Sequence, residues 1–369
     1  MKKFISMAMA GCMALSLAAC GGSSASTAES TATSTEATSE AAASGSKTDV
    51  AFVTDVGNID DQSFNQYTWQ GVQDFCSANS LNANYYRPTE DSDAARLEQM
   101  DNAVNDGAKA VVVAGYLFGS SIAEAQAKYP DVEFLALDVS TSDLGDTTPT
   151  ENTALITYKE EQAGYLAGYA AVTEGYTQLG FIGADEVPGI VRYVTGFMQG
   201  AEYAAEQQGL TVNLRTWFTG TYQAGDETTN RMLDWCNNGT TLLFVSGGNL
   251  VASAIDAANE TTSENTVRVL AADYDQTGLS DVMLGSAIKC YSSAVQQELY
   301  EFFSGNATWG QAAAGQSEKV GYTTGAVALA GPYWRYEQLS QRDYERLYEQ
   351  LRNSVLKVDS YADMRTLPD

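Results

Sequence analysis

Short apolar runs alternate with segments of helical periodicity from residue 48 onward. The first run, Val50–Val53, has the length and β-branched content of a buried parallel strand. A polar loop that begins at Asp55 follows it, and Phe64 lies in the first turn of a predicted helix. Because ligands bind at the carboxyl ends of strands in open α/β sheets, this loop is a candidate site. The alternative is an acidic turn that caps the helix, with Phe64 in the core.

The same alternation continues along the chain and predicts a parallel sheet in each half. Tyr193 lies in the first turn of a second unit of strand, polar loop and helix. Two such lobes, each with an aromatic residue at its strand-end edge, predict a cleft that clamps a ring. The further predicted strands are 109–114, 132–137, 178–182, 211–217, 242–245 and 267–271, and the predicted helices are 93–106, 120–128, 160–173, 190–207, 225–237 and 249–259.

The N-terminal segment differs from the rest in composition. Two lysines precede an apolar run over residues 4–19, which is typical of an export signal and too short for a convincing membrane span. The run ends in Leu-Ala-Ala-Cys at Cys20, which resembles the lipobox of bacterial lipoproteins. We therefore predict a signal peptide over 1–19, lipidation of Cys20 and a flexible Ser/Thr/Ala/Glu tether over 20–48. The alternative is an ordinary secretory signal with an incidental cysteine.

The charge and the absence of histidine narrow the function. Lys and Arg total 20 against 47 Asp and Glu, so the net charge of −27 argues against nucleic acid and against electrostatic adhesion to anionic lipid. With no histidine, the chain has no Ser-His-Asp or Cys-His catalysis and no histidine metal site. We expect a binding protein without a cofactor or a metal rather than an enzyme.

The cysteines are widely scattered and show no CxxC or metal-ligand spacing. Cys76, Cys236 and Cys290 lie in the globular part. We interpret them as small buried apolar residues, with a disulfide as the alternative.

Several segments resemble one known family. DVGNIDDQSFNQ at residues 55–66 closely resembles the signature of the basic membrane protein family, whose members are substrate-binding lipoproteins of ABC importers. The best-known members bind purine nucleosides. The resemblance extends over about residues 49–330. The other similar segments are GFIG at 180–183 with Pro188, YVTGF at 193–197, VSGG at 245–248, DYDQ at 273–276 and SAIK at 286–289.

The resemblance implies an α/β type I periplasmic-binding-protein fold, with two Rossmann-like lobes joined by three crossing strands. We take the polar residues 141–152 as the first crossing and predict a final strand over 355–358. The predicted first lobe comprises 49–152 and 276–322, and the second comprises 153–275 and 323–369.

Carried over by position, the resemblance implies a ring clamp. Phe64 and Tyr193 would sandwich the base, although family members commonly have Phe at the second position. Tyr116 and Tyr222 are further candidates for lining the cleft.

The resemblance also implies a set of polar contacts. Asp55 and Asn65 would bond to base or sugar, and a carboxylate suits a vicinal diol because it accepts both hydroxyl protons. Lys289 would donate to a hydroxyl or hold the carboxylates in place. The alternatives are that the strand-end carboxylates are caps and that the glycines only form a tight turn. The remaining implied contacts are Asp138, Asp273, Gly247 and Gly248.

The leading hypothesis is a lipid-anchored receptor that binds a purine nucleoside and delivers it to an ABC permease and its ATPase. The same fold could instead bind riboflavin or a sugar. Two other classes remain open: a nucleoside hydrolase that uses the carboxylates, and a sensory or adhesive surface lipoprotein.

Overall fold

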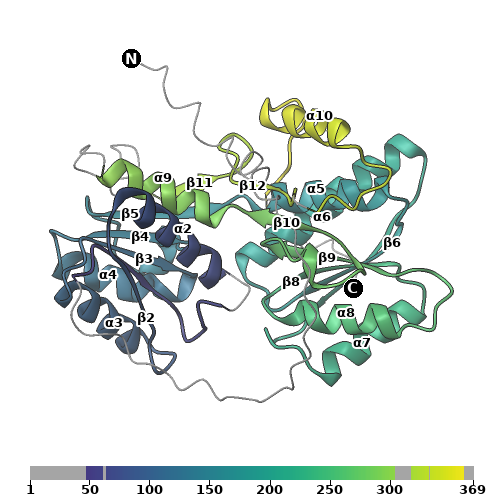
Figure 1. The fold of residues 1–369 in the computed structure, drawn as a ribbon. Coiled ribbons are helices and arrows are strands. Elements are labelled where there is room, and N and C mark those ends of the chain that lie inside the picture. The colour runs from purple at the N-terminus through teal and green to yellow at the C-terminus, as the bar shows by residue number, and fades with distance from the viewer. Residues whose placement is uncertain (1–46, 61–63, 304–316, 332, 361–369) are drawn as a thin grey trace, which may run out of the picture.

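The computed structural model describes residues 47–60, 64–303, 317–331 and 333–360. Two α/β lobes lie side by side, each built on a six-stranded sheet (Figure 1). The first lobe contains β1 (Val50–Val53), α2 (Phe64–Asn79), β2 (Ala83–Tyr86), α3 (Asp93–Asn105), β3 (Ala110–Ala114), α4 (Gly119–Lys128), β4 (Glu133–Leu137), β5 (Thr153–Tyr158), α9 (Tyr291–Phe303) and β11 (Ser317–Val320). The second contains α5 (Glu160–Thr173), β6 (Gln178–Gly183), α6 (Pro188–Gln208), β7 (Asn213–Phe218), α7 (Asp226–Asn237), β8 (Leu242–Ser246), α8 (Leu250–Glu260), β9 (Arg268–Asp273), β10 (Met283–Lys289), β12 (Val327–Leu329) and α10 (Gln341–Arg352).

Strand register brings the candidate loops to one edge of each sheet. The first sheet has the order β11-β5-β4-β3-β1-β2 and the second the order β12-β10-β9-β8-β6-β7. Among the described strands the pairing is parallel except between β10 and β12. Val53 pairs with Val113, and Ala114 pairs with Leu137, so β1, β3 and β4 end together. Parallel pairing with fully buried strands is why the sequence shows continuous apolar runs there.

Helices α5 and α6 pack against each other at unusually close range. A Cβ on Gly164 would lie 2.2 Å from the carbonyl oxygen of Tyr193, and one on Gly196 would lie 1.8 Å from that of Glu161. Only glycine allows the two backbones to approach so closely. This contact fixes the start of α6 beside the start of α5, where several charged side chains lie.

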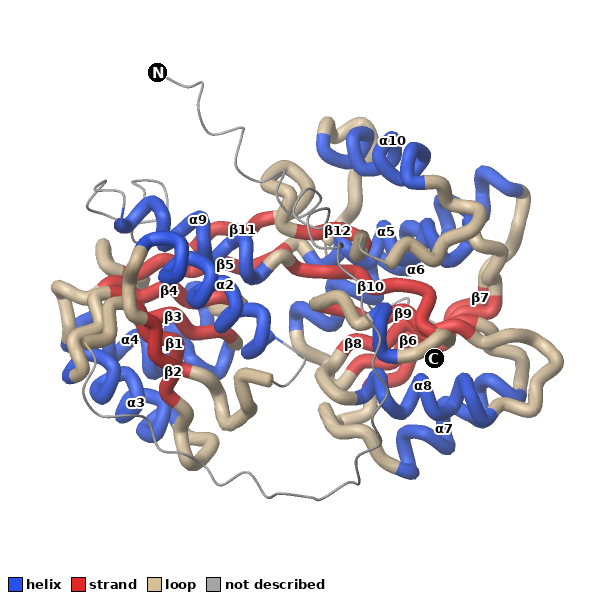
Figure 2. The backbone as a smooth tube through the Cα atoms, viewed as in Figure 1, coloured by secondary structure: helices blue, strands red, loops and turns tan. Residues whose placement is uncertain are grey.

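The chain crosses between the sheets three times, after β5, after β10 and after β11. Figure 2 shows these strands and β12 along the side on which the lobes are joined. The expected boundaries differ from this topology. Because β5 pairs with β4, the chain leaves the first sheet after Tyr158 rather than within 141–152. Because β10 pairs with β9, residues 283–289 belong to the second sheet and not to the first lobe.

Residues 355–358 do not form the predicted strand. The amides of Val355 and Leu356 both donate to the carbonyl oxygen of Gln350, so this segment folds back on the end of α10.

Other sequence predictions concern the cysteines and the N-terminal segment. Cys76, Cys236 and Cys290 are buried thiols, as the sequence indicated. The predicted signal peptide, the lipidated Cys20 and nearly all of the tether lie outside the described residues. Within the described residues, no helix combines the length and apolar character needed to cross a bilayer.

Candidate functional site

The centre of the candidate site is a buried ammonium group that binds carboxylates from both lobes. Lys289 Nζ lies 2.8 Å from Asp138 Oδ2, 3.1 Å from Asp273 Oδ1 and 3.6 Å from Glu160 Oε1. The Lys289 side chain is only 7% exposed. Burial alone would lower the pKa of Lys289, but the three carboxylates outweigh that effect and hold its pKa well above the usual range. Lys289 therefore stays charged and holds the carboxylates together, one of the two roles that the sequence implied.

Asp138 and Asp273 occupy equivalent places in the two lobes. Each lies at the carboxyl end of a strand, Asp138 directly after β4 and Asp273 as the last residue of β9, and each has a positive φ, 55° and 74°. Non-glycine residues seldom adopt this conformation, and such strain is concentrated at functional sites. Each side chain is also about one quarter exposed. Both carboxylates can therefore still accept hydrogen bonds from a ligand. Asp138 additionally accepts a hydrogen bond of 2.5 Å from the hydroxyl of Tyr291.

A second ion pair adjoins this centre through Glu160. Arg192 Nε donates to Glu160 Oε2 at 2.6 Å and lies 3.9 Å from Glu161 Oε2. Both glutamates are almost fully buried. From the sequence alone, two acidic residues at the start of a helix would be expected to be exposed to solvent. The carboxylates outweigh burial and raise the pKa of Arg192. Sequence reasoning missed these residues, because only the glycines that bring α5 and α6 together signal that the pair is enclosed.

Two tyrosine rings also flank the ammonium group of Lys289. Its Nζ lies 5.4 Å from the ring centroid of Tyr158 and 5.1 Å from that of Tyr291. At these distances both rings favour the cation. No pattern in the sequence had indicated a role for either residue.

The first-lobe loop is held by the pair Asp55 and Asn65. Asp55 Oδ1 accepts hydrogen bonds of 2.7 Å from the amide of Gly57 and from Asn65 Nδ2. Asn65 is buried, whereas Asp55 is half-buried at the sheet edge. Phe64, the first residue of α2, is half-buried, and a Cβ on Gly115 would lie 3.9 Å from its Cε2 atom. The structure thus brings these loop residues together at the strand ends, as the sequence predicted.

Tyr193 does not line an open cleft. Its ring is 1% exposed and packs edge-on against Phe244, with the centroids 5.9 Å apart. Its hydroxyl donates to the carbonyl oxygen of Ala287 at 3.3 Å and accepts from the amide of Asp273 at 3.2 Å. Nothing can stack on this ring as it lies here. The predicted sandwich of Phe64 and Tyr193 is therefore corrected: Tyr193 supports the backbone of Asp273 instead.

Tyr116 and Tyr222 come from opposite lobes and interact. Tyr116 follows β3 and is 45% exposed, and Tyr222 follows β7 and is 40% exposed. Partial burial raises the pKa of Tyr222 to about 12, with contributions from a hydrogen bond to Tyr116 and from Asp185 and Asp273. Tyr67 and Tyr274 form another contact between the lobes, with ring centroids 5.2 Å apart. Aromatic contacts therefore join the two lobes beyond the crossings.

The glycine turn after β8 is required by the backbone. Gly247 and Gly248 have φ values of 146° and 54°. A Cβ on Gly247 would lie 2.2 Å from the Cβ of Ala184, and Gly248 lies against Tyr222. The turn therefore packs on the loop after β6 and supports one of the exposed rings.

No group of acidic or cysteine side chains suited to a metal occurs in the described part of the chain.

Residues 48–360 match the family described as ABC transporter substrate-binding protein, PnrA-like. The chain belongs to this family. Its relatives include an uncharacterized lipoprotein of Pyrococcus abyssi, 26% identical over 234 residues, which are 62% of this chain and 56% of the relative. The ABC transporter nucleoside-binding protein BmpA of Lactococcus lactis subsp. cremoris is 29% identical over 163 residues, 42% of this chain and 44% of that protein. The chain spans about half the length of such curated relatives.

The PnrA-like family match confirms the resemblance to basic membrane proteins, and another relative bears that name, basic membrane protein B of Borreliella burgdorferi. The family is one of substrate-binding proteins. Among solved structures, an ABC transporter solute-binding protein from Aeropyrum pernix matches with a TM-score of 0.71 at 17% identity, over 86% of this chain and 95% of that one. One from Conexibacter woesei has a TM-score of 0.67 at 16% identity, over 85% and 100%. The predicted type I periplasmic-binding-protein fold is confirmed.

Proposed function

We propose that this chain is the extracytoplasmic substrate-binding component of an ABC importer and that it binds a purine nucleoside between its lobes. The observation that carries the proposal is the convergence of Asp138 and Asp273 on Lys289. A carboxylate from each lobe meets at one partly exposed point, so a ligand there contacts both lobes. The Lactococcus lactis relative is named as a nucleoside-binding protein, which supports the choice of ligand.

The two carboxylates suit the ribose of a nucleoside. Each can accept hydrogen bonds from hydroxyl groups, and bonds to charged acceptors are about twice as strong as neutral ones. Two carboxylates this close would repel each other without Lys289 between them. The net charge of −27 adds to the negative potential of the chain. Lys289 thus offsets this repulsion and holds both acceptors in place while they bind the diol.

The base would lie against Phe64, beneath the ring pair of Tyr116 and Tyr222. Phe64 lies beside Gly115, the residue before Tyr116, and Tyr222 lies within electrostatic reach of Asp273. Aromatic groups and carboxylates therefore share one region, which suits a ligand with a flat face and hydroxyl groups. Stacking on such rings contributes roughly 1–3 kcal/mol per base. The amides at Gly247 and Gly248 and the side chain of Asp55 complete the proposed polar contacts.

Transport would couple ligand binding to the relative position of the lobes. A ligand that contacts both lobes favours the closed state by its differential affinity for that state. Relatives are named as lipoproteins, which supports the lipid anchor at Cys20 on the extracytoplasmic face of the membrane. The permease and its ATPase would receive the closed, loaded protein.

The test is calorimetric titration of the full chain, unfolded and refolded beforehand to remove any carried ligand. Guanosine, inosine and adenosine are compared with ribose, free bases and riboflavin. We expect micromolar or tighter binding of nucleosides but not of ribose or bases. Asp273→Ala should weaken binding about tenfold or more, whereas Asp131→Ala, at an exposed aspartate, should not.

Two results would contradict the proposal. Binding of riboflavin with no response to any nucleoside would contradict the nucleoside ligand, although the ligand could still bind in the cleft. Nucleoside binding that Asp273→Ala leaves unchanged would place the ligand elsewhere.

A further inference from the structure

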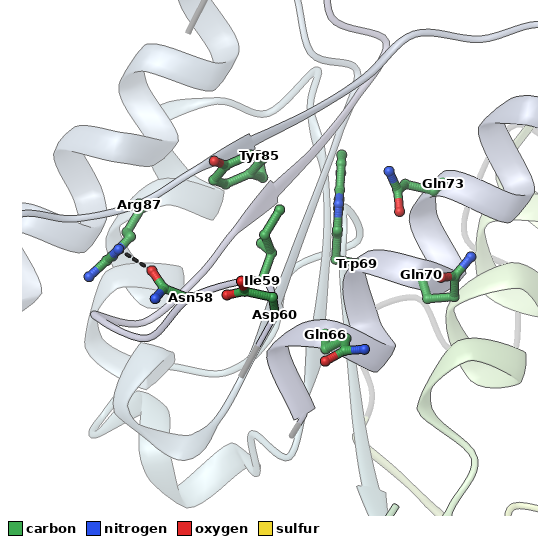
Figure 3. Close-up of a pocket in the computed structure, with 9 residues that line it drawn as sticks. All are labelled: Asn58, Ile59, Asp60, Gln66, Trp69, Gln70, Gln73, Tyr85 and Arg87. Carbon is green, nitrogen blue, oxygen red and sulfur yellow. Dashed lines mark hydrogen bonds between the residues drawn. The ribbon is translucent and has the colours of Figure 1, made fainter. Parts of the chain in front are cut away.

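A pocket of about 520 Å³ lies on the first lobe alone, between the edge strand β2 and the helix α2 (Figure 3). Figure 3 shows Tyr85 and Arg87 on one wall and side chains of α2 on the other, with the loop that contains Ile59 between them. None of the candidate cleft residues lines it. Among the described residues, the lining consists of Asn58, Ile59, Asp60, Gln66, Trp69, Gln70, Gln73, Tyr85 and Arg87.

The pocket lies on a different side of α2 from the contact with the other lobe. Gln66, Gln70 and Gln73 have the spacing of one helical stripe. Tyr67, which contacts Tyr274 of the second lobe, lies roughly a quarter turn away from Gln66. A ligand in this pocket would therefore contact only the first lobe, and its binding would not require the lobes to close.

An exposed aromatic ring is held rigidly at the pocket wall. Tyr85 is 42% exposed, and its ring meets that of Trp69 at 61° with centroids 5.7 Å apart. Trp69 in turn stacks on Phe52 in the core, with centroids 6.4 Å apart. The ring of Tyr85 is thus pre-positioned, and a preformed apolar face reduces the entropy lost on binding.

The polar lining is dense and nearly neutral. The amide side chains offer both hydrogen-bond donors and acceptors, as a hydroxyl group requires. Arg87 is fixed by donating from Nε to the carbonyl oxygen of Val56 at 3.0 Å and from its terminal nitrogen to Asn58. Asp60 supplies a single opposing carboxylate. One cation and one anion suit neither a polyanion nor a polycation.

From these features we propose that the pocket binds a neutral saccharide. A sugar ring presents an apolar C–H face, which matches Tyr85, and a rim of hydroxyl groups, which matches the glutamines, Asn58, Asp60 and Arg87. The site is separate from the cleft, so sugar and cleft ligand bind without competition. It would let a chain that carries one small molecule also attach to a glycan.

The experiment is saturation-transfer NMR on the full chain with glucose, N-acetylglucosamine, maltose and cellobiose, each tested with and without inosine. We expect a signal from at least one of these sugars that inosine leaves unchanged. Tyr85→Ala should weaken binding about tenfold, and Gln73→Ala, which changes only an exposed helical position, should weaken it less. Tyr300→Ala, at an exposed tyrosine on α9, is the matched control and should bind as the wild type does.

Three outcomes would overturn the proposal. One is the absence of a signal from all four sugars. Another is equal binding by the Tyr85→Ala and Tyr300→Ala variants. The third is loss of the sugar signal in Asp273→Ala, because the sugar would then occupy the cleft.

Discussion

The Nζ atom of Lys289 lies 2.8 Å from a carboxylate oxygen of Asp138, although the two residues lie at the ends of strands in different sheets. Lys289 ends β10 in the second lobe, and Asp138 follows β4 in the first. The same nitrogen lies 3.1 Å from Asp273 and 3.6 Å from Glu160. One buried cation thus links both lobes at the place where the chain crosses between them.

Replacing this cation should destabilise the fold strongly. Lys289→Met leaves Asp138, Asp273 and Glu160 close together without a counter-ion. Breaking a buried ion pair in this way costs about 3–5 kcal/mol of unfolding free energy. Urea denaturation measures the loss. Lys109→Met, at an exposed lysine, is the control and should change stability by less than about 0.5 kcal/mol. Equal stability of the two variants would contradict the role given to Lys289.

The hydroxyl of Tyr193 should matter for stability, because it bridges the amide of Asp273 and the carbonyl oxygen of Ala287. Tyr193→Phe leaves both buried groups without this partner, so it should lower the free energy of unfolding by about 1 kcal/mol. Guanidinium denaturation can resolve that difference. The control is Tyr300→Phe on the surface of α9. If Tyr193→Phe were no less stable than this control, the hydroxyl would not hold Asp273 in place.

Gly247→Ala should destabilise the turn after β8. The new Cβ would lie 2.2 Å from that of Ala184, and the φ of 146° strains any side chain. We expect a loss of about 1–3 kcal/mol, measured by thermal unfolding of the variant. Gly225→Ala provides the comparison, since a Cβ there meets no atom within 4 Å and its φ of 179° suits any residue. A turn that only carried the ligand would instead leave the two variants equally stable.

Stability should depend on pH through Glu298 of α9. Burial, followed by the charges of Glu301 and Glu318, raises its pKa from 4.5 to about 8. Between these two values the folded chain retains a proton that the unfolded chain has lost. Stability therefore falls as the pH rises from about 4.5 to about 8 and levels off above that.

Glu298→Gln removes this titration. The variant should gain on the order of 3 kcal/mol over the wild type at pH 9 and almost nothing at pH 4. Urea denaturation at both pH values checks it, with Glu337→Gln at an exposed glutamate as the control. A gain of the same size at both pH values would show that Glu298 is not protonated in the fold.

Most of the fold could be predicted from local pattern. Buried parallel strands such as Val50–Val53 and Ala110–Ala114 read directly as apolar runs, and the helix Glu160–Thr173 was predicted at its observed bounds. The boundaries between lobes were less accessible. Thr153–Tyr158 follows a long polar loop, and only its pairing with β4 assigns it to the first sheet. Sheet membership is a long-range property that no local pattern contains.

For the candidate site, the sequence and the family resemblance point to residues at strand ends, but they do not identify residues whose role depends on burial. Asp138, Asp273 and Lys289 follow or end strands, and the structure brings them together. Glu160 is the first residue of α5 and Tyr193 lies in the second turn of α6, where the sequence does not show which face of the helix is covered. The close approach of α5 and α6 buries both residues. Glu160 is an ion-pair partner of Lys289, and the hydroxyl of Tyr193 holds the backbone of Asp273.

The most direct test of the central claim is titration of the Phe64→Leu variant with inosine, compared with the wild type. Phe64 is the half-buried ring at the strand-end edge of the first lobe, and losing its stacking should weaken binding about tenfold or more. Tyr300→Leu, at an exposed aromatic residue on α9, should bind as the wild type does. Unchanged inosine affinity in a folded Phe64→Leu variant would contradict a nucleoside site between the lobes.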